Sequence, residues 1–423
     1  MSISFSKGSV AMMDLFTRRA APLALLALGC AGNGAQQASA ERPDRGSAYA
    51  LVTLVWGADG PPTGYVALTD SLDVESISLE QAREFPGYTS IGVADGQLLV
   101  SPSAEDPTIE RYQITSTFDW IGTGKLSFGN LGAEEVGFYR QYMAGDHSAN
   151  VDVDVTGRLL WDPAGFLLEG TKSDAVLPLQ RDGLDLFANF NRTQFNFDQQ
   201  IIRPFSHHDQ DWFRWSPDTQ LVVYDTDTNE VAKVINAPCP GLDSITRDEQ
   251  GRLYLSSWEY SALNPLIGNG AAPCTVRLNP DLAIDTSWDG DLTDMTQGRP
   301  VVNFRYVGGG RAIGVVLHDE EYGPDFDFSQ YLQNVDDFWK DSAQFHRLWM
   351  FNIEARSGTP VQGIDAFDFI NPGIFHAVQA GRIFVFVVGT DDAQTVVYEL
   401  EPDGRATRRF SVPGTVTQWV SLR

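Results

Sequence analysis

The stretch Gly251-Arg252-Leu253-Tyr254-Leu255-Ser256-Ser257-Trp258 decides how the fold of this chain is interpreted. It follows the polar turn Asp248-Glu249-Gln250 and leads across a loop to a second apolar run, Thr275-Val276-Arg277-Leu278. A glycine-led turn, a strand, a polar loop and a partner strand are typical of an antiparallel hairpin. The sequence therefore predicts two paired strands here.

The same pattern returns four times along the chain. The copies are Gly96–Val100 with Thr108–Ile114, Gly157–Leu160 with Gly165–Leu168, Gly310–Leu317 with Leu348–Ile353, and Gly381–Val388 with Thr395–Leu400. One antiparallel unit used repeatedly is typical of a β-propeller. We therefore predict an all-β fold consisting of a single β-propeller.

The hairpins mark out about seven blades, although six or eight fit the same pattern. The predicted blades lie near residues 47–70, 88–130, 136–180, 184–236, 240–290, 298–363 and 366–423. We expect the N-terminal strand Ala48–Val55 to close the ring by joining the last blade near Val416–Leu422, because closure removes an exposed edge.

One insertion shows a helical period instead of a strand pattern. Between Asp319 and Phe345, six apolar residues recur at spacings of three and four: Phe328, Tyr331, Leu332, Val335, Phe338 and Trp339. Such a stripe predicts one short amphipathic helix that covers a rim or face of the propeller. A role in clamping a ligand is the alternative.

The first 46 residues are predicted to lie outside the folded domain. Arg18-Arg19 precedes a short apolar run, which ends in Ala27-Leu28-Gly29-Cys30. This ending resembles the lipobox of bacterial lipoproteins, which implies a signal peptide over residues 1–30 and lipidation of Cys30. An ordinary secretory signal with a chance cysteine is the alternative. Residues 31–46 have no apolar period and are expected to form a flexible tether, followed by the propeller over 47–423.

Three cysteines occur in the chain, and Cys239 and Cys274 remain once Cys30 is assigned to lipid. Each stands in an Ala-Pro-Cys tripeptide beside the hairpin described first. In an oxidising compartment a disulfide between them is expected. No His or Cys lies at metal-ligand spacing from either one, so we assign no metal and no cofactor to the sequence.

The balance of charge is acidic, with 56 Asp and Glu against 30 Lys and Arg and a net charge of −26. This field repels nucleic acid, so no nucleic-acid partner is expected. An anionic small molecule would need a local cluster of arginines.

The densest group of aromatic and basic residues runs from Arg203 to Trp215. Ring faces and guanidinium groups suit a flat aromatic or anionic ligand, through stacking and paired hydrogen bonds. The candidate ligand-binding residues in this group are Arg203, His207, His208, Trp212, Arg214 and Trp215, and weaker candidates elsewhere are Tyr139, Arg140, Tyr142 and Trp258. A purely structural role, with the tryptophans in the core, is the alternative.

The lipobox, the short tether and a propeller of long blades with aromatic and arginine-bearing loops together resemble the propeller lipoproteins of bacterial siderophore systems, which include the MxcI-like proteins. The resemblance implies a lipid-anchored protein of the outer membrane, periplasmic or surface-exposed, that is linked to iron transport. Its partners would be a ferric siderophore or an outer-membrane transporter.

Two other functions stay open from the sequence. A propeller hydrolase or lactonase would hold a divalent metal on the central axis through carboxylates and Asn from different blades. A protein-interaction scaffold would need no small ligand. No Gly-x-Ser-x-Gly, His-Glu-x-x-His or phosphate-binding glycine loop occurs, so no catalytic residue is assigned.

Overall fold

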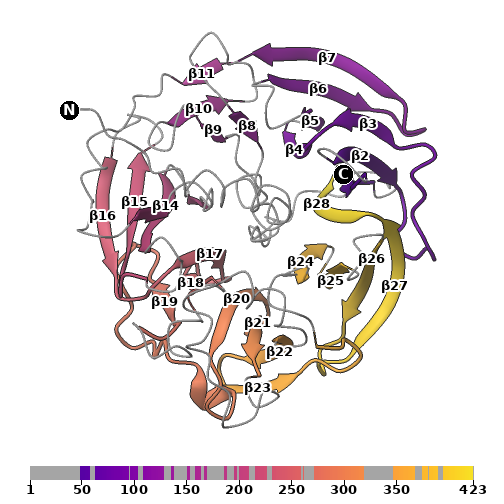
Figure 1. Cartoon of the computed structure of the whole chain (residues 1–423). Helices are drawn as coiled ribbons and strands as arrows, with labels where there is room; N and C mark the ends of the chain where they lie inside the picture. Colours follow the sequence, from indigo (N-terminus) through magenta and orange to yellow (C-terminus); the bar gives the residue numbers. More distant parts are fainter. Residues whose placement is uncertain are drawn as a thin grey trace, which may run out of the picture.

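The computed structural model shows β-sheets arranged side by side in a ring (Figure 1). It describes residues 48–57, 62–94, 96–102, 108–127, 135–137, 150–152, 158–162, 166–168, 185–187, 195–197, 200–208, 215–225, 231–258, 261, 271–318, 346–366, 374–379, 381–388 and 394–422. The predicted signal peptide, the tether and the insertion that contains the predicted helix lie outside these residues. In the described part of the chain, the helical element is a 3-10 turn, η5 (Thr293–Met295).

The strands of the first half of the chain are β1 (Tyr49–Val55), β2 (Thr63–Thr69), β3 (Arg83–Pro86), β4 (Ser90–Ala94), β5 (Gln97–Ser101), β6 (Thr108–Ile114), β7 (Trp120–Ser127), β8 (Glu135–Gly137), β9 (Asn150–Asp152), β10 (Arg158–Asp162), β11 (Phe166–Leu168), β12 (Asp185–Phe187), β13 (Phe195–Phe197), β14 (Gln200–His208) and β15 (Thr219–Asp225). Those of the second half are β16 (Val231–Ala237), β17 (Leu242–Arg247), β18 (Leu253–Ser257), β19 (Thr275–Leu278), β20 (Val301–Gly308), β21 (Arg311–Leu317), β22 (His346–Asn352), β23 (Ser357–Pro360), β24 (Ile374–Gln379), β25 (Arg382–Val388), β26 (Gln394–Leu400), β27 (Ala406–Pro413) and β28 (Thr415–Ser421).

These strands form seven sheets within the described residues. In ring order they are β28-β1-β2-β3, β4-β5-β6-β7, β8-β9-β10-β11, β12-β14-β15-β16 with β13 also on β14, β17-β18-β19, β20-β21-β22-β23 and β24-β25-β26-β27. We number the sheets one to seven in this order. All five predicted hairpins are confirmed as antiparallel pairs. The all-β propeller is therefore confirmed, whereas the number of blades stays a prediction.

The glycines that lead the predicted hairpins have a conformational role where the structure describes them. Gly251 and Gly381 have φ angles of 80° and 77°. This left-handed region is open to glycine at little cost and strains other residues. The turn can therefore reverse the chain tightly between the first and second strands of a sheet.

Ring closure differs from the prediction in one respect. β1 and β28 do pair, from Tyr49 opposite Ser421 to Leu54 opposite Thr415. However, β28 belongs to sheet one rather than to the last sheet, so the C-terminal strand completes the first blade. The cause is Gly414, whose φ of 77° turns the chain away from β27. A Cβ at this glycine would lie 2.4 Å from the carbonyl oxygen of Leu54.

The hydrophobic core lies between neighbouring sheets. In β18, Leu253 and Leu255 join a cluster with sheet four, whereas Tyr254 packs with Phe304 of sheet six. Both faces of the strand are therefore buried, and its residues are buried throughout. This explains why such strands read as apolar runs rather than as alternating patterns.

Two threonines connect the outer part of a sheet to the next blade. Thr219, which begins β15, donates from Oγ1 to the carbonyl of Cys239 at 2.8 Å and accepts the N–H of Leu242 at 3.1 Å. Thr395 of β26 repeats this with Gly414 at 2.8 Å and Val416 at 2.9 Å. The hydroxyls thus satisfy buried backbone groups at the crossing between blades.

Candidate functional site

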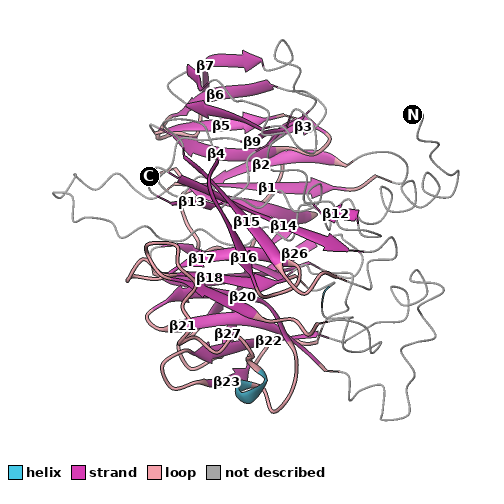
Figure 2. Cartoon of the chain, turned by 90° about the vertical axis from the view of Figure 1, so that its left-hand side faces the viewer, coloured by secondary structure: helices cyan, strands magenta, loops and turns pink. Residues whose placement is uncertain are grey.

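The predicted candidate residues with described side chains gather at one face of the ring. β14 ends at His208, and β18 ends at Ser257, directly before Trp258. These are second strands, counted outward from the axis, so they end at the same face. Figure 2 shows the sheets from the side, so that their strands run across the view. We define the His–Trp face by His207, His208, Trp215 and Trp258, together with His318, His346 and Trp349 of sheet six.

Aromatic contacts join sheets four and five at this face. The ring centroids of His208 and Trp215 are 5.1 Å apart, and those of Trp215 and Trp258 are 6.3 Å apart at 80°. The backbone N–H of Ser216 donates to the carbonyl of His207 at 2.8 Å, which holds Trp215 against β14. Two separate sequence clusters therefore form one aromatic group.

A glycine allows this close approach. Gly241 has no side chain, and its carbonyl accepts a hydrogen bond from the backbone N–H of Trp258 at 2.8 Å. A Cβ at Gly241 would lie 3.2 Å from the ring of Trp215 and 3.0 Å from Cβ of Ser261. The φ of Gly241 is 56°, so a side chain here would strain the backbone and would also press on Ser261 and the Trp215 ring.

The predicted disulfide is present beside the aromatic group. Cys239 and Cys274 are bonded, with their Cα atoms 5.7 Å apart. The Ser257 hydroxyl donates to the carbonyl of Pro240 at 2.7 Å, and it accepts the N–H of Cys274 at 3.0 Å. The crossing from β16 to β17 is thereby fixed both covalently and by hydrogen bonds, directly next to Trp258.

Sheet six contributes a second His–Trp pair at the corresponding end. His318 follows β21, and the indole N–H of Trp349 donates to its Nε2 at 3.3 Å. His346, which begins β22, is also buried. Four of the six histidines in the chain therefore lie at this face.

Burial decides how these side chains can act. Trp215, Trp258 and Trp349 are 2%, 3% and 2% exposed, and the histidines are equally enclosed. They form a packed layer beneath the face rather than an open surface on which a ring could stack. The purely structural role named above as the alternative therefore accounts for how these side chains pack. Their role in ligand binding stays a prediction.

The remaining predicted residues could not be placed in this layer. Arg203 lies on β14 opposite Val222 of β15. Trp212, Arg214, Tyr139, Arg140 and Tyr142 lie outside the described residues. His318, His346 and Trp349 were not among the predicted site residues, because His318 lies far in the sequence from the other two and their strands read as ordinary apolar runs. The available signal was a histidine at the end of the second strand of sheet four and another directly after the second strand of sheet six.

The opposite ends of the sheets carry ion pairs between arginines and carboxylates. Arg277 contacts Asp285 at 2.6 Å, and Arg382 contacts Glu399 at 2.6 Å. The hydroxyl and backbone N–H of Ser287, together with Arg277, lower the pKa of Asp285 to about 2. These arginines are neutralised locally, so they do not offer a cluster for an anionic ligand.

A buried tyrosine and a glutamate connect sheets five and six at those opposite ends. The Tyr306 hydroxyl donates to the carboxylate of Glu249, and the backbone N–H of Gly309 donates to the same carboxylate at 2.9 Å. Burial, together with this carboxylate, raises the pKa of Tyr306. Burial alone would raise the pKa of Glu249, but the two hydrogen bonds lower it overall. The contact is therefore an ionised carboxylate held by a neutral phenol.

Two further observations concern metals and membranes. Among the residues that the structure describes, no group of three or more His, Cys, Asp or Glu side chains is arranged to hold a metal ion. None of the helices in that same part of the chain has the length and apolar character to cross a bilayer.

Comparison with known proteins gives structural likeness without sequence likeness. No protein-family profile and no curated protein matches the chain. A quinoprotein alcohol dehydrogenase-like protein from Bacteroides thetaiotaomicron aligns over 90% of this chain and 80% of its own, with 8% identity and a TM-score of 0.47. A putative 6-phosphogluconolactonase from Bacteroides fragilis aligns over 90% and 99%, with 10% identity and a TM-score of 0.46.

The β-propeller domain of the Trilobed protease from Pyrococcus furiosus aligns over 85% of this chain and 93% of its own, with 8% identity and a TM-score of 0.44. Values this low carry no activity over to this chain. Its own ring of antiparallel sheets shows that it is a β-propeller protein.

Proposed function

We propose that this chain is a non-catalytic binding propeller, anchored to the outer membrane through Cys30, that takes up a ferric siderophore at the His–Trp face. The observation that carries the proposal is the buried layer of paired His and Trp side chains at the corresponding ends of sheets four, five and six. An outer-membrane transporter would be the protein partner.

The anchor is supported by the lipobox ending at Cys30 and by the disulfide. A disulfide is kept in oxidising compartments such as the periplasm, where a processed lipoprotein resides. Acyl chains on a cysteine hold a protein firmly, because each buried methylene contributes about 0.8 kcal/mol.

A rigid layer beneath a face is useful for binding, because preorganised supports reduce the entropy that a ligand must offset. The disulfide, Gly241 and the hydroxyl of Ser257 all fix the backbone around Trp258. The ligand would bind at these strand ends, next to the layer that contains Trp258 and Trp215.

Charge restricts the class of siderophore. The chain has a net charge of −26, and the arginines described above are held in ion pairs. A ferric tris-catecholate carries three negative charges, whereas a ferric trihydroxamate is neutral because three monoanions balance Fe³⁺. We therefore expect the neutral chelate to bind more tightly.

Tryptophan fluorescence of the full chain with Cys30→Ser tests the binding. Ferric trihydroxamates absorb visible light and would quench tryptophans near the face, even buried ones. We expect saturable quenching by the ferric chelate, with no quenching by the iron-free ligand. The tris-catecholate should bind at least tenfold more weakly.

Matched variants assign the quenching to the face. Trp258→Phe should weaken binding about tenfold, which corresponds to about 1.4 kcal/mol. Trp120→Phe, at the start of β7 on the outer edge of sheet two and at the opposite end of the strands, should leave affinity unchanged. Equal effects of the two variants, or no quenching by either chelate, would refute the proposal. Saturable binding of a bare divalent metal would instead favour the hydrolase.

A further inference from the structure

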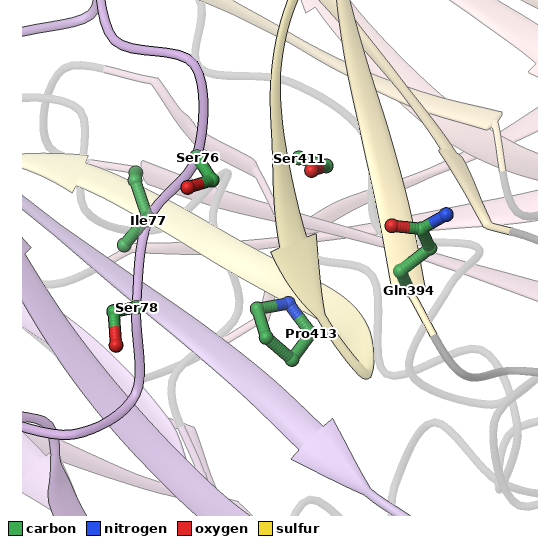
Figure 3. A pocket seen from close by; sticks show the side chains of 6 residues that line it. All are labelled: Ser76, Ile77, Ser78, Gln394, Ser411 and Pro413. Atoms are coloured by element: carbon green, nitrogen blue, oxygen red, sulfur yellow. The ribbon is translucent and has the colours of Figure 1, made fainter.

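A groove lies on the seam where sheet one meets sheet seven (Figure 3). The connection between β2 and β3, residues 70–82, crosses to the outer edge of β27. Ile77 donates its backbone N–H to the carbonyl of Ser411 at 2.9 Å, and Ser411 donates to the carbonyl of Glu75 at 3.3 Å. The connection therefore adds a short parallel bridge to an otherwise open edge strand.

The connection is anchored on both sides of this bridge. Leu72 and Ile77 are buried in the cluster that contains Phe410 and Val412. Arg382 of β25 contacts the carboxylate of Asp73 at 3.0 Å. One wall of the groove is thus held in place by contacts outside the groove itself.

The groove has a volume of about 440 Å³, within the range of roughly 300–1,000 Å³ found for small-molecule sites. Its lining residues are Ser76, Ile77, Ser78, Gln394, Ser411 and Pro413. Figure 3 shows Ser76, Ile77 and Ser78 on one side and Gln394, Ser411 and Pro413 on the other. Pro413 is exposed and provides apolar surface between the polar groups.

Hydrogen-bonding capacity is available in the lining. Ser78 accepts the backbone N–H of Glu80 at 3.2 Å. The side chains of Ser76, Ser411 and Gln394 make no hydrogen bond within the described part of the chain. These three groups supply two hydroxyls and one amide, which both donate and accept.

Among the residues that the structure describes, those that line the groove carry no charged side chain. A phosphate, sulfate or carboxylate would find no cationic partner there, and the net charge of −26 opposes it. A cationic ligand would find no carboxylate among these described lining residues. The chemistry that remains is a neutral molecule with several hydroxyls and an apolar face.

We propose that this groove binds a neutral oligosaccharide. Its hydroxyls would exchange hydrogen bonds with Ser76, Ser411 and Gln394, and the C–H face of a sugar ring would lie on Pro413. Because the two walls come from the first and last sheets, binding also fastens the ring at its seam. This site is separate from the His–Trp face.

Isothermal titration of the full chain tests the proposal. The probes are the neutral trisaccharides maltotriose, cellotriose and chitotriose, with the acidic trimer of galacturonate as the charged comparison. We expect at least one neutral trisaccharide to bind with a dissociation constant of roughly 1 mM or tighter. It should also raise the melting temperature, because it binds only the folded chain.

Variants locate the site. Gln394→Leu and Ser76→Ala should each weaken binding at least tenfold. The matched variants Gln113→Leu and Ser116→Ala, both at exposed positions of sheet two, should not change it. Binding of a ferric chelate should be the same in all four variants, which separates this site from the proposed function.

Three results would overturn the inference. One is the absence of saturable binding by every neutral trisaccharide up to roughly 10 mM. Another is tighter binding of the galacturonate trimer than of the neutral sugars. The last is a loss of affinity in Gln113→Leu as large as the loss in Gln394→Leu.

Discussion

Reduction of the Cys239–Cys274 bond should destabilise the propeller by an amount that the loop length sets. The two cysteines are separated by 35 residues, and cross-linking such a loop removes about 13 cal/mol/K of entropy from the unfolded chain. At 25 °C this corresponds to about 4 kcal/mol of unfolding free energy. The bond joins the crossing from β16 to β17 with the start of β19, so its loss should first loosen sheet five.

The assay is urea unfolding of the chain with Cys30→Ser, followed by circular dichroism, with and without a phosphine reductant. We expect the unfolding free energy to fall by about 3–4 kcal/mol on reduction. Affinity for a ferric trihydroxamate should fall as well, because Gly241 and Trp258 lose a covalent support.

The double variant Cys239→Ser with Cys274→Ser is the control. It should be destabilised to a similar extent, and the reductant should then have no effect. If reduction of the chain that keeps both cysteines lowers the unfolding free energy by less than about 1 kcal/mol, the reasoning is refuted, because the entropy of the loop would not then determine the stabilisation. Sensitivity of the double variant to the reductant would show that the effect arises elsewhere.

Four further predictions follow from the described contacts. Gly414→Ala should lower the unfolding free energy in urea by at least about 2 kcal/mol, because φ at this position is 77° and the new Cβ would meet the carbonyl of Leu54. An unchanged unfolding free energy would contradict the ring closure described above. Thr395→Val should cost about 1–3 kcal/mol, because two buried backbone groups lose their partner, whereas exposed Thr359→Val on β23 should cost little. The pKa of Asp285 is lowered to about 2 from an ordinary 3.8, so this carboxylate contributes stability that is complete above pH 4 and lost as pH falls towards 2. Asp285→Asn should remove at most about 2 kcal/mol of that pH dependence. An unchanged dependence of the unfolding free energy on acid pH would contradict this. Cys30→Ser should move the protein from the membrane pellet to the soluble fraction, and unchanged sedimentation would exclude the lipid anchor.

Local patterns predicted the hairpins well, because each one is encoded within a short stretch. The Gly251 turn and the strand that follows contain their own signal, with a glycine at positive φ and a run buried on both faces. The pairing of β1 with β28 was also predictable, since an open ring leaves two exposed edges. The sheet to which β28 belongs was not, because it depends on the direction in which Gly414 turns the chain.

Contacts between distant segments were beyond the reach of sequence patterns. Trp215 and Trp258 appeared as separate candidates, and their contact depends on the absence of a side chain at Gly241. Likewise, His318 meets Trp349 only because β21 and β22 pair in one register. The connection on the edge of β27 has neither strand nor helix periodicity, so nothing in its sequence indicated a partner.

The most direct test of the binding account is hydrogen–deuterium exchange of the chain with and without a ferric trihydroxamate. The account predicts slower exchange in peptides at the ends of β14 and β18, including Trp215–Thr219 and Leu255–Trp258. Exchange at the opposite turns, around Asp248–Arg252 and Gly308–Arg311, should not change. Protection confined to those opposite turns, or saturable binding with no protection at the His–Trp face, would contradict the account.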